Sequence, residues 1–212
     1  MKAKPLFDPA AAVAHLRAAD PKLAAVIDRA GPYAPARGPA KDLFEALLRA
    51  IVYQQLNGRA AEAIHGRVLA VMKKKHARLH DALALCSDDE LRAAGLSRGK
   101  LAAIRDLHAK TADGTVPSEK EARALGDEAL VERLTQIRGI GPWTVHMLLL
   151  FHLGRPDVMP TGDFAVRLAF KQIYGKRKDP TPAQILRHAR RWQPYRSVAS
   201  WYLWRHLDTP TP

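Results

Sequence analysis

The most informative segment of the sequence is Leu134–His146, which reads LTQIRGIGPWTVH. An amphipathic helix runs into Gly139-Ile140-Gly141, then comes a proline, and then a second amphipathic helix. The glycines permit a very tight turn and allow another backbone to approach closely. The turn also leaves N–H groups at the start of the second helix pointing outward, and these donors suit a phosphate. A bare Gly-Ile-Gly is equally typical of an ordinary helical hairpin with glycine at its C-cap, so both interpretations remain open at this point.

Helical patterns also dominate the rest of the chain. Asp8-Pro9 and Asp20-Pro21 each resemble an N-cap followed by proline at the first helical position. Apolar residues recur at helical spacing from Leu43 to Gln54, and Ser87 with Glu90 forms a capping box. No segment shows sustained strand alternation, so the predicted fold class is all-α. Further helices are expected at about residues 99–112, 127–136, 142–152, 164–174, 182–191 and 194–206.

The charge of the chain indicates a polyanionic partner. Lys and Arg number 34 and Asp and Glu number 21, which gives a formal net charge of +13 and a pI near 10.2. The last 50 residues carry ten basic residues against three acidic ones. Nucleic acid is the commonest partner of such a balance. The alternative is a solvated basic surface without a specific partner.

Composition excludes several classes of protein. An apolar fraction of 47% is that of an ordinary globular protein, which rules out general disorder. The most apolar window, Trp143–Leu153, is too short for a membrane span, which needs about 20 apolar residues. The first residues show no signal peptide. A single cysteine, Cys86, excludes an internal disulfide, a cysteine-ligated zinc site and a four-cysteine iron–sulfur cluster. We expect a cytoplasmic protein with no membrane association and no such cofactor.

Four motifs, in family order, resemble one family of DNA repair enzymes. Leu134–His146 resembles the helix-hairpin-helix of the base-excision DNA glycosylases, and Asp157–Phe164 (DVMPTGDF) resembles their following loop with its catalytic aspartate. Phe44–Gln55 (FEALLRAIVYQQ) and Arg191–Trp204 (RWQPYRSVASWYLW) narrow the resemblance to the 3-methyladenine DNA glycosylase II branch. The resemblance covers roughly residues 40–206. The resemblance includes no counterpart of the extra N-terminal β-domain that some members of the family carry.

The resemblance implies two helical lobes with an active-site cleft between them. The central lobe spans residues 41–154 and holds the helix-hairpin-helix at 134–152, and residues 1–40 plus 155–212 form the second lobe. Asp163 is then the catalytic carboxylate, with the N-cap of the next helix as its ordinary structural role. An ionised carboxylate beside a flipped sugar stabilises oxocarbenium character and orients a water. Trp143 stands where glycosylases with lyase activity carry a lysine, so no Schiff base forms by the usual route.

The resemblance further assigns a base pocket. Trp143 and Trp204 take the aromatic positions of the family's cleft, and Tyr53 and Met147 are further candidates. An indole face attracts an N-alkylated, cationic purine by roughly 0.5–2 kcal/mol. The alternative is that both tryptophans are core residues. Some members have a tyrosine at the position of Met147 and a second aspartate at that of Gly162, which leaves the shape of the pocket open.

DNA contacts are expected at residues of three motifs: Gln55, Gly139, Gly141, Thr144 and Arg196. Gln55 aligns with the residue that fills the gap left by the flipped base, although a helix-terminal glutamine bonding to backbone fits nearly as well. Arg196 either contacts a phosphate or pairs with an internal carboxylate. By the resemblance, the main-chain carbonyls of Thr135, Ile137 and Gly139 bind a monovalent cation.

These expectations define a monofunctional DNA glycosylase. It would hydrolyse the N-glycosidic bond of 3-methyladenine- and 7-methylguanine-type purines in double-stranded DNA, as a monomer and without an obligatory cofactor. The alternative is a non-catalytic helix-hairpin-helix DNA-binding protein. Asp163 and the two tryptophans argue against that alternative, because binding alone needs neither.

Overall fold

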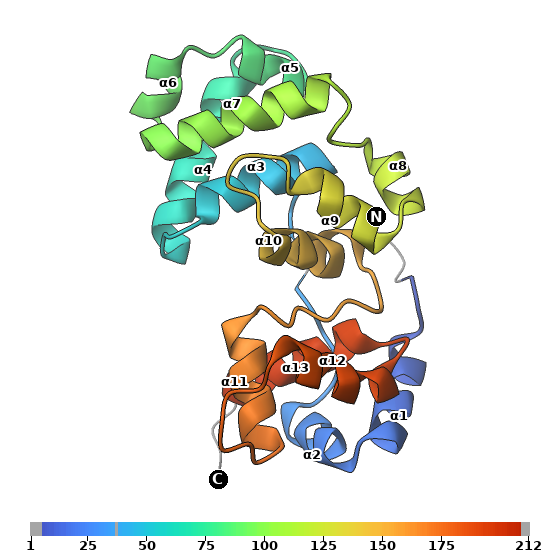
Figure 1. Ribbon diagram of the computed structural model, residues 1–212. Helices are drawn as coiled ribbons and strands as arrows, with labels where there is room; N and C mark the ends of the chain where they lie inside the picture. The colour runs from blue at the N-terminus through green and yellow to red at the C-terminus, as the bar shows by residue number, and fades with distance from the viewer. Residues whose placement is uncertain (1–5, 37, 209–212) are drawn as a thin grey trace. The chain divides into compact units, whose positions relative to one another are not determined.

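The computed structural model describes residues 6–36 and 38–208, and every regular element within these ranges is a helix (Figure 1). The all-α prediction is therefore confirmed. The chain divides into two compact units, one formed by residues 1–37 and 149–212 and the other by residues 38–148. Within the described ranges, no helix combines the length and the apolar character needed to cross a membrane.

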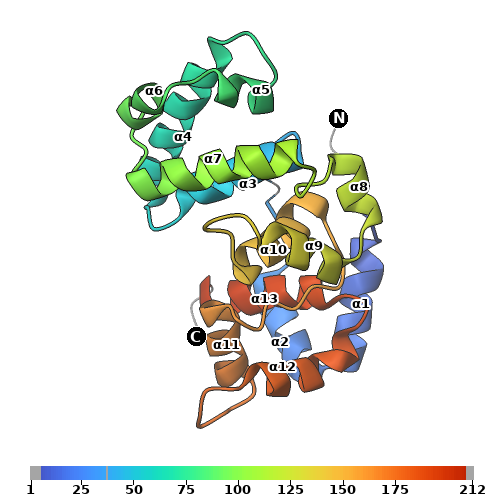
Figure 2. The same ribbon diagram turned by 45° about the horizontal axis from the view of Figure 1, so that its top comes forward.

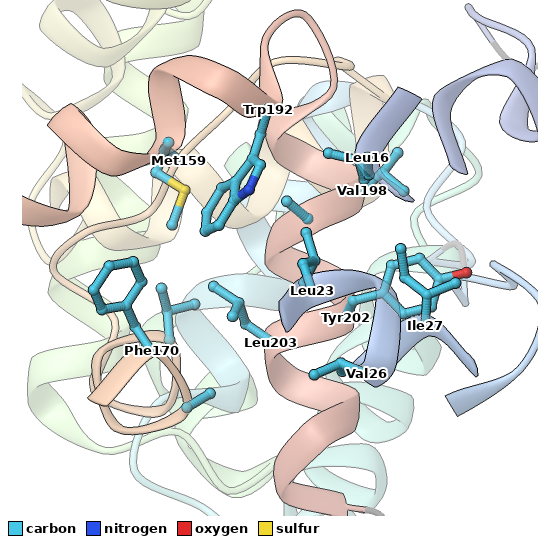
Figure 3. Packing of buried hydrophobic residues seen from close by; sticks show 14 of the residues in the cluster. Leu16, Leu23, Val26, Ile27, Met159, Phe170, Trp192, Val198, Tyr202 and Leu203 are labelled. Atoms are coloured by element: carbon cyan, nitrogen blue, oxygen red, sulfur yellow. The ribbon is translucent and has the colours of Figure 1, made fainter. Parts of the chain in front are cut away.

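The first unit joins the two ends of the chain. Its helices are α1 (Pro9–Ala19), α2 (Pro21–Ala30), the π-helix η1 (Leu149–Leu153), α11 (Phe164–Ile173), α12 (Pro182–Ala189), the 3₁₀ helix η2 (Arg190–Trp192) and α13 (Arg196–Asp208). Helix α13 packs against both α11 and α2. Figure 3 shows Met159, Phe170 and Trp192 gathered on one side of α13 and residues of α2 on the other, so α13 is the central helix of this unit.

A buried carboxylate lies at the edge of this core. Asp20 caps α2 through the N–H groups of its first turn, as its Asp-Pro sequence predicts. Its Oδ2 also accepts hydrogen bonds from the Tyr174 hydroxyl (2.8 Å), His188 Nε2 (2.8 Å) and Trp192 Nε1 (3.0 Å). Burial alone would raise the pKa of Asp20, but these hydrogen bonds hold it well below its ordinary value. The carboxylate thus joins α2, α11, α12 and η2.

The second unit carries the helical hairpin. Its helices are α3 (Leu43–Tyr53), α4 (Gly58–Lys73), α5 (Leu79–Ala84), α6 (Asp88–Ala93), α7 (Arg98–Ala112), α8 (Glu119–Ala124), α9 (Asp127–Leu134) and α10 (Pro142–Leu148). The apolar face of α3 is completely buried at Leu47, Leu48 and Ile51. Helix α7 packs along α3, and α10 packs against both α9 and α3 (Figure 2).

The structure differs from the predicted elements in three places. The helix expected to reach His152 ends as an α-helix at Leu148 and continues as the π-helix η1, which groups with the first unit rather than with the central lobe. Helices α5 and α8 lie in segments for which the sequence pattern predicts no helix. Each has six residues, too few for a recognisable apolar period.

Candidate active site

Asp163 accepts hydrogen bonds from donors in α11 and α13. It is the N-cap residue of α11, and its Oδ1 accepts the backbone N–H of Val166 at 2.8 Å. The same oxygen accepts the indole N–H of Trp204, on α13, at 3.0 Å. The side chain is only 9% exposed. These two hydrogen bonds orient the carboxylate at the end of the loop.

Trp204 therefore has a structural task in addition to the predicted contact with a base. Its ring lies 5.6 Å from the ring of Phe151, measured between centroids and tilted by 34°. It is half-buried and packs against the core of the first unit. The packing fixes the ring and the indole N–H fixes the Asp163 carboxylate, so Trp204 positions the candidate catalytic group.

The loop that ends at Asp163 is fastened to α13. Arg196 forms a two-point ion pair with Asp157, with Nε to Oδ1 at 2.7 Å and Nη2 to Oδ2 at 2.9 Å. Ser197 contributes twice, because its N–H donates to the Pro156 carbonyl (3.0 Å) and its Oγ accepts the N–H of Val158 (2.9 Å). Of the two roles weighed for Arg196, the structure shows the internal ion pair, and we propose no phosphate contact for it.

An exposed aromatic ring follows the carboxylate directly. Phe164 is 77% exposed, although it begins a helix whose next turn, from Val166 on, enters the core. A large apolar side chain in water is unfavourable unless a partner covers it. Its place at the end of the DVMPTGDF motif predicted no role for it.

The hairpin turn of the second unit is held at its backbone. Gly139 has a φ of +80°, a conformation that favours glycine. The N–H of Arg138 donates to Oδ2 of Asp106 at 2.7 Å, and the carbonyl of Gly139 accepts the side-chain N–H of Gln54 at 2.7 Å. A Cβ added at Gly141, by contrast, would meet nothing within 4 Å. Gly139 thus serves the fold, whereas the space above Gly141 is open to a partner.

The first turn of α10 contains two predicted site residues, and only one of their side chains is exposed. Trp143 is 49% exposed, whereas the side chain of Thr144 is buried. A DNA contact at Thr144 would therefore use its backbone. The first N–H groups of any α-helix have no acceptor within their own helix, which keeps this end of α10 suitable for a phosphate.

The loop after α3 places Gln55 on the surface. Gln55 is exposed and has a φ of +56°, in the left-handed region that non-glycine residues rarely adopt. Strained conformations of this kind cluster at functional sites, where the surrounding structure imposes them. Tyr53, two residues before Gln55, is half-buried. The guanidinium of Arg49 lies 3.6 Å from the centre of the Tyr53 ring. One face of Tyr53 is therefore already covered by a cation.

Comparison with known proteins identifies the family of the chain. The family model described as the HhH-GPD superfamily of base excision DNA repair proteins matches residues 48–194, which include the hairpin, the Asp163 loop and the first four residues of the Arg191–Trp204 motif. The chain belongs to this superfamily. The predicted resemblance to this family is thereby confirmed.

Relatives within the superfamily are similar over nearly the whole chain. DNA-3-methyladenine glycosylase 1 of Schizosaccharomyces pombe is 36% identical over 192 residues, which cover 90% of this chain and 84% of the relative. The structure of the S. pombe 3-methyladenine DNA glycosylase Mag1 in complex with abasic DNA matches with a TM-score of 0.76, covering 92% of this chain and 95% of that one. A DNA-3-methyladenine glycosidase from Bacillus halodurans matches with a TM-score of 0.82 at 33% identity, covering 96% and 91%.

The predicted site residues of this glycosylase-superfamily member fall into two groups. Asp163, Trp204 and Arg196 belong to the first unit, where the first two are in direct contact. The others belong to the second unit, where Gln55, Gly141 and Trp143 are accessible or have open space above them. Met147, on α10, is half-buried. The roles of all these residues remain predictions.

Several residues that shape the site were not predicted from the sequence. Asp157 and Phe151 position Arg196 and Trp204, and Gln54 and Asp106 hold the hairpin turn. Their partners lie far away in the sequence, so no local pattern reveals these contacts. The Gln-Gln pair at 54–55 is the local signal for Gln54, although the family resemblance assigns a role only to Gln55.

Proposed function

We propose that the protein is a monofunctional DNA-3-methyladenine glycosylase, which hydrolyses the N-glycosidic bond of alkylated purines in duplex DNA. The observation that carries the proposal is the Asp163 carboxylate, oriented by the N–H of Val166 and the indole of Trp204 in a member of a base excision repair superfamily. The names of the relatives support the substrate class, because several are DNA-3-methyladenine glycosylases.

The carboxylate supplies the chemistry of hydrolysis. The bond between the anomeric carbon and the base nitrogen breaks, and its electron pair leaves with the purine. An N-alkylated purine is cationic, so it departs as a neutral base and needs little acid catalysis. The charge of Asp163 stabilises the oxocarbenium-like sugar. Asp163 also orients a water, whose oxygen bonds to the anomeric carbon while its proton passes to the carboxylate and then to solvent. The product is an abasic site.

Exposed aromatic side chains suit the recognition of a flipped base. Trp143 and Phe164 are both large and exposed. Stacking of a base on an aromatic ring contributes about 1–3 kcal/mol, and a cationic base adds a cation–π attraction. Tyr53 is a weaker candidate, because Arg49 already lies over its ring. Recognition would then depend on the charge and the π-face of the lesion, which favours 3-methyladenine and 7-methylguanine over uncharged 8-oxoguanine.

The absence of lyase activity follows from the residue at position 143. In the family that the chain resembles, glycosylases with lyase activity use a lysine of the hairpin as the nucleophile. Here that position holds Trp143, whose indole cannot form a Schiff base. The strand therefore remains intact after the base has left. The non-catalytic alternative is not favoured, since the closely matched relatives are named as glycosylases.

Contacts with the phosphates hold the enzyme on duplex DNA. The net charge of +13 attracts the backbone, and the Gly139–Gly141 turn with the first turn of α10 positions it. A monovalent cation at the carbonyls of Thr135, Ile137 and Gly139 fits only in part. The carbonyl of Ile137 already accepts the N–H of Ile140 at 3.0 Å, and that of Gly139 accepts Gln54. Each keeps a second lone pair for a cation, which would bring a positive charge to the turn. We further propose that the enzyme acts as a monomer, in the cytoplasm.

The proposal is tested with a panel of duplexes that contain one 3-methyladenine, 7-methylguanine, ethenoadenine or 8-oxoguanine. Wild-type protein should release the two methylated purines fastest and leave an alkali-labile abasic strand, and borohydride should trap no covalent adduct. A trapped adduct would show that a lysine acts as nucleophile and that the enzyme is a lyase. Tight binding of every duplex without release of any base would instead establish the non-catalytic alternative.

A further inference from the structure

We propose that Gln54 and Asp106 are positioning residues that clamp the hairpin turn to the loop carrying Gln55. The turn that binds a phosphate and the loop that fills the gap are thereby held together as one rigid unit, which couples phosphate binding to base extrusion. The inference rests on the proposed function and deepens it, since it names the residues that couple the grip on the backbone to the filling of the gap. All of these residues lie in the second unit.

The clamp acts on two consecutive residues of the turn. Asp106, on α7, accepts the N–H of Arg138 at 2.7 Å, and Gln54 donates to the carbonyl of Gly139 at 2.7 Å. The turn also rests on α7 itself, because a Cβ at Gly139 would lie 3.6 Å from that of Ala103. The backbone that is to meet a phosphate is therefore fixed from α7 on one side and from the end of α3 on the other.

Further contacts fix the loop on both sides of Gln55. Lys100, also on α7, donates to the carbonyl of Val52 at 2.6 Å and so holds the last turn of α3. Asn57 caps α4, since its Oδ1 accepts the N–H of Ala60 at 2.9 Å. Gln55 lies between these anchors with its φ of +56°. A strained, exposed residue keeps such a backbone only where its neighbours impose it, and here Gln54 connects it directly to the turn.

The arrangement explains how binding energy could be used for base extrusion. Flipping a base requires it to leave the stack, and a side chain that fills the gap sustains the extruded state. A filling residue on a loose loop would have to be ordered at that moment, which opposes insertion. A loop joined to the phosphate-binding turn is already placed when the turn binds, so Gln54 lowers the barrier to extrusion without touching the lesion.

The variants isolate each hydrogen bond with little change of size. Gln54→Glu replaces the amide donor by a carboxylate, which cannot donate to the carbonyl of Gly139. Its control is Gln136→Glu, because the amide of Gln136 donates at 3.5 Å only to the Glu132 carbonyl and the charge change near the hairpin is the same. Asp106→Leu removes both the negative charge and the oxygen that accepts the Arg138 N–H. Its control is Asp106→Asn, which removes the charge but keeps an acceptor oxygen.

The readout compares single-turnover excision of 7-methylguanine paired with cytosine and mispaired with thymine. Extrusion is easiest for a mismatched base, so Gln54→Glu and Asp106→Leu should slow the paired substrate about tenfold and the mispaired one by less than about threefold. Gln136→Glu and Asp106→Asn should stay within about twofold of wild type on both. The proposal would be overturned if Gln54→Glu and Asp106→Leu slowed both substrates equally. It would also be overturned if these two variants reacted as fast as their controls.

A second measurement separates this inference from the proposed function. The fluorescence of 2-aminopurine placed beside an abasic site rises when the neighbouring stack is opened, whether or not any base is excised. At saturating protein, Gln54→Glu should reduce that rise by at least half, and Gln136→Glu should not. If wild-type protein excises nothing, the proposed function fails and this comparison still decides on the clamp. An unchanged fluorescence rise in Gln54→Glu would refute it.

Discussion

Trp204→Phe removes one hydrogen-bond donor next to the candidate catalytic carboxylate and leaves an aromatic ring in place. The indole N–H of Trp204 donates to Oδ1 of Asp163 at 3.0 Å, and the ring packs 5.6 Å from that of Phe151. A phenylalanine can keep much of that ring contact. The substitution therefore separates the two tasks considered for this residue, which are orienting Asp163 and stacking on a base.

The expected effect follows from the kind of hydrogen bond that is lost. A hydrogen bond to an ionised group contributes about 1.5–3 kcal/mol, and each 1.36 kcal/mol corresponds to about a factor of ten in rate. Trp204 is half-buried, and Val166 still donates to the same oxygen. We therefore expect the single-turnover rate to fall by roughly ten- to a hundredfold, with the affinity for lesion DNA changed by less than about threefold.

The assay compares 7-methylguanine with a neutral lesion such as ethenoadenine in wild type, Trp204→Phe and Trp204→Leu. If Trp204 orients Asp163, Phe and Leu slow both lesions by similar factors. If it stacks on the base, Phe retains most activity, while Leu slows the cationic lesion more than the neutral one. A Trp204→Phe variant with the wild-type rate would refute the positioning role.

Three further changes test the fold and the DNA contacts. Asp20→Asn leaves an amide that cannot accept all the hydrogen bonds the carboxylate accepts, so the free energy of unfolding should fall by about 3–5 kcal/mol, as measured by urea denaturation. The folded protein holds the pKa of Asp20 below its ordinary value, so this stabilisation is complete above about pH 4 and is lost as the pH falls further; the variant should lose less stability in acid. Gln55→Gly relieves a left-handed residue and should raise the free energy of unfolding by up to about 1 kcal/mol, while excision slows at least tenfold. Gly141→Ala should leave thermal stability unchanged, because its Cβ has open space, and weaken binding to duplex DNA about tenfold.

Each of these expectations can fail separately. An Asp20→Asn variant as stable as wild type would show that the buried carboxylate is not a stabilising junction. Destabilisation of Gln55→Gly by more than about 1 kcal/mol would mean that its side chain supports the fold rather than the DNA. Undiminished DNA affinity in Gly141→Ala would place the phosphate elsewhere than above this turn.

Local patterns predicted the helices well because each carries its own signals. The Asp20-Pro21 start of α2 and the Ser87–Glu90 capping box of α6 are present as expected. These features depend on residues within one turn of each other, which a sequence displays directly. The capping box of Ser118 and Glu121 likewise begins α8, and attention to it would have predicted that helix as well.

The site was predicted only as far as its motifs reach. Asp163 was expected as an N-cap and is one, and the glycine turn was expected from its sequence. The hydrogen bonds from Trp204 to Asp163, 41 positions away, and from Gln54 to Gly139, 85 positions away, could not be predicted from local patterns. Such contacts arise when helices distant in sequence pack together, and no periodicity within either helix encodes them. Long-range packing therefore decided which of the possible roles these side chains take.

If the carboxylate of Asp163 performs the chemistry, replacing it by an amide should abolish excision and preserve binding. Single-turnover release of 7-methylguanine from duplex DNA is compared between wild type and Asp163→Asn, with affinity for the same duplex measured in parallel. The amide can still accept the hydrogen bonds of Val166 and Trp204, so the fold and the binding of DNA should persist. The account predicts a rate at least about a thousandfold lower, because removal of the charge abolishes stabilisation of the developing cation. Release at the wild-type rate by Asp163→Asn would contradict it.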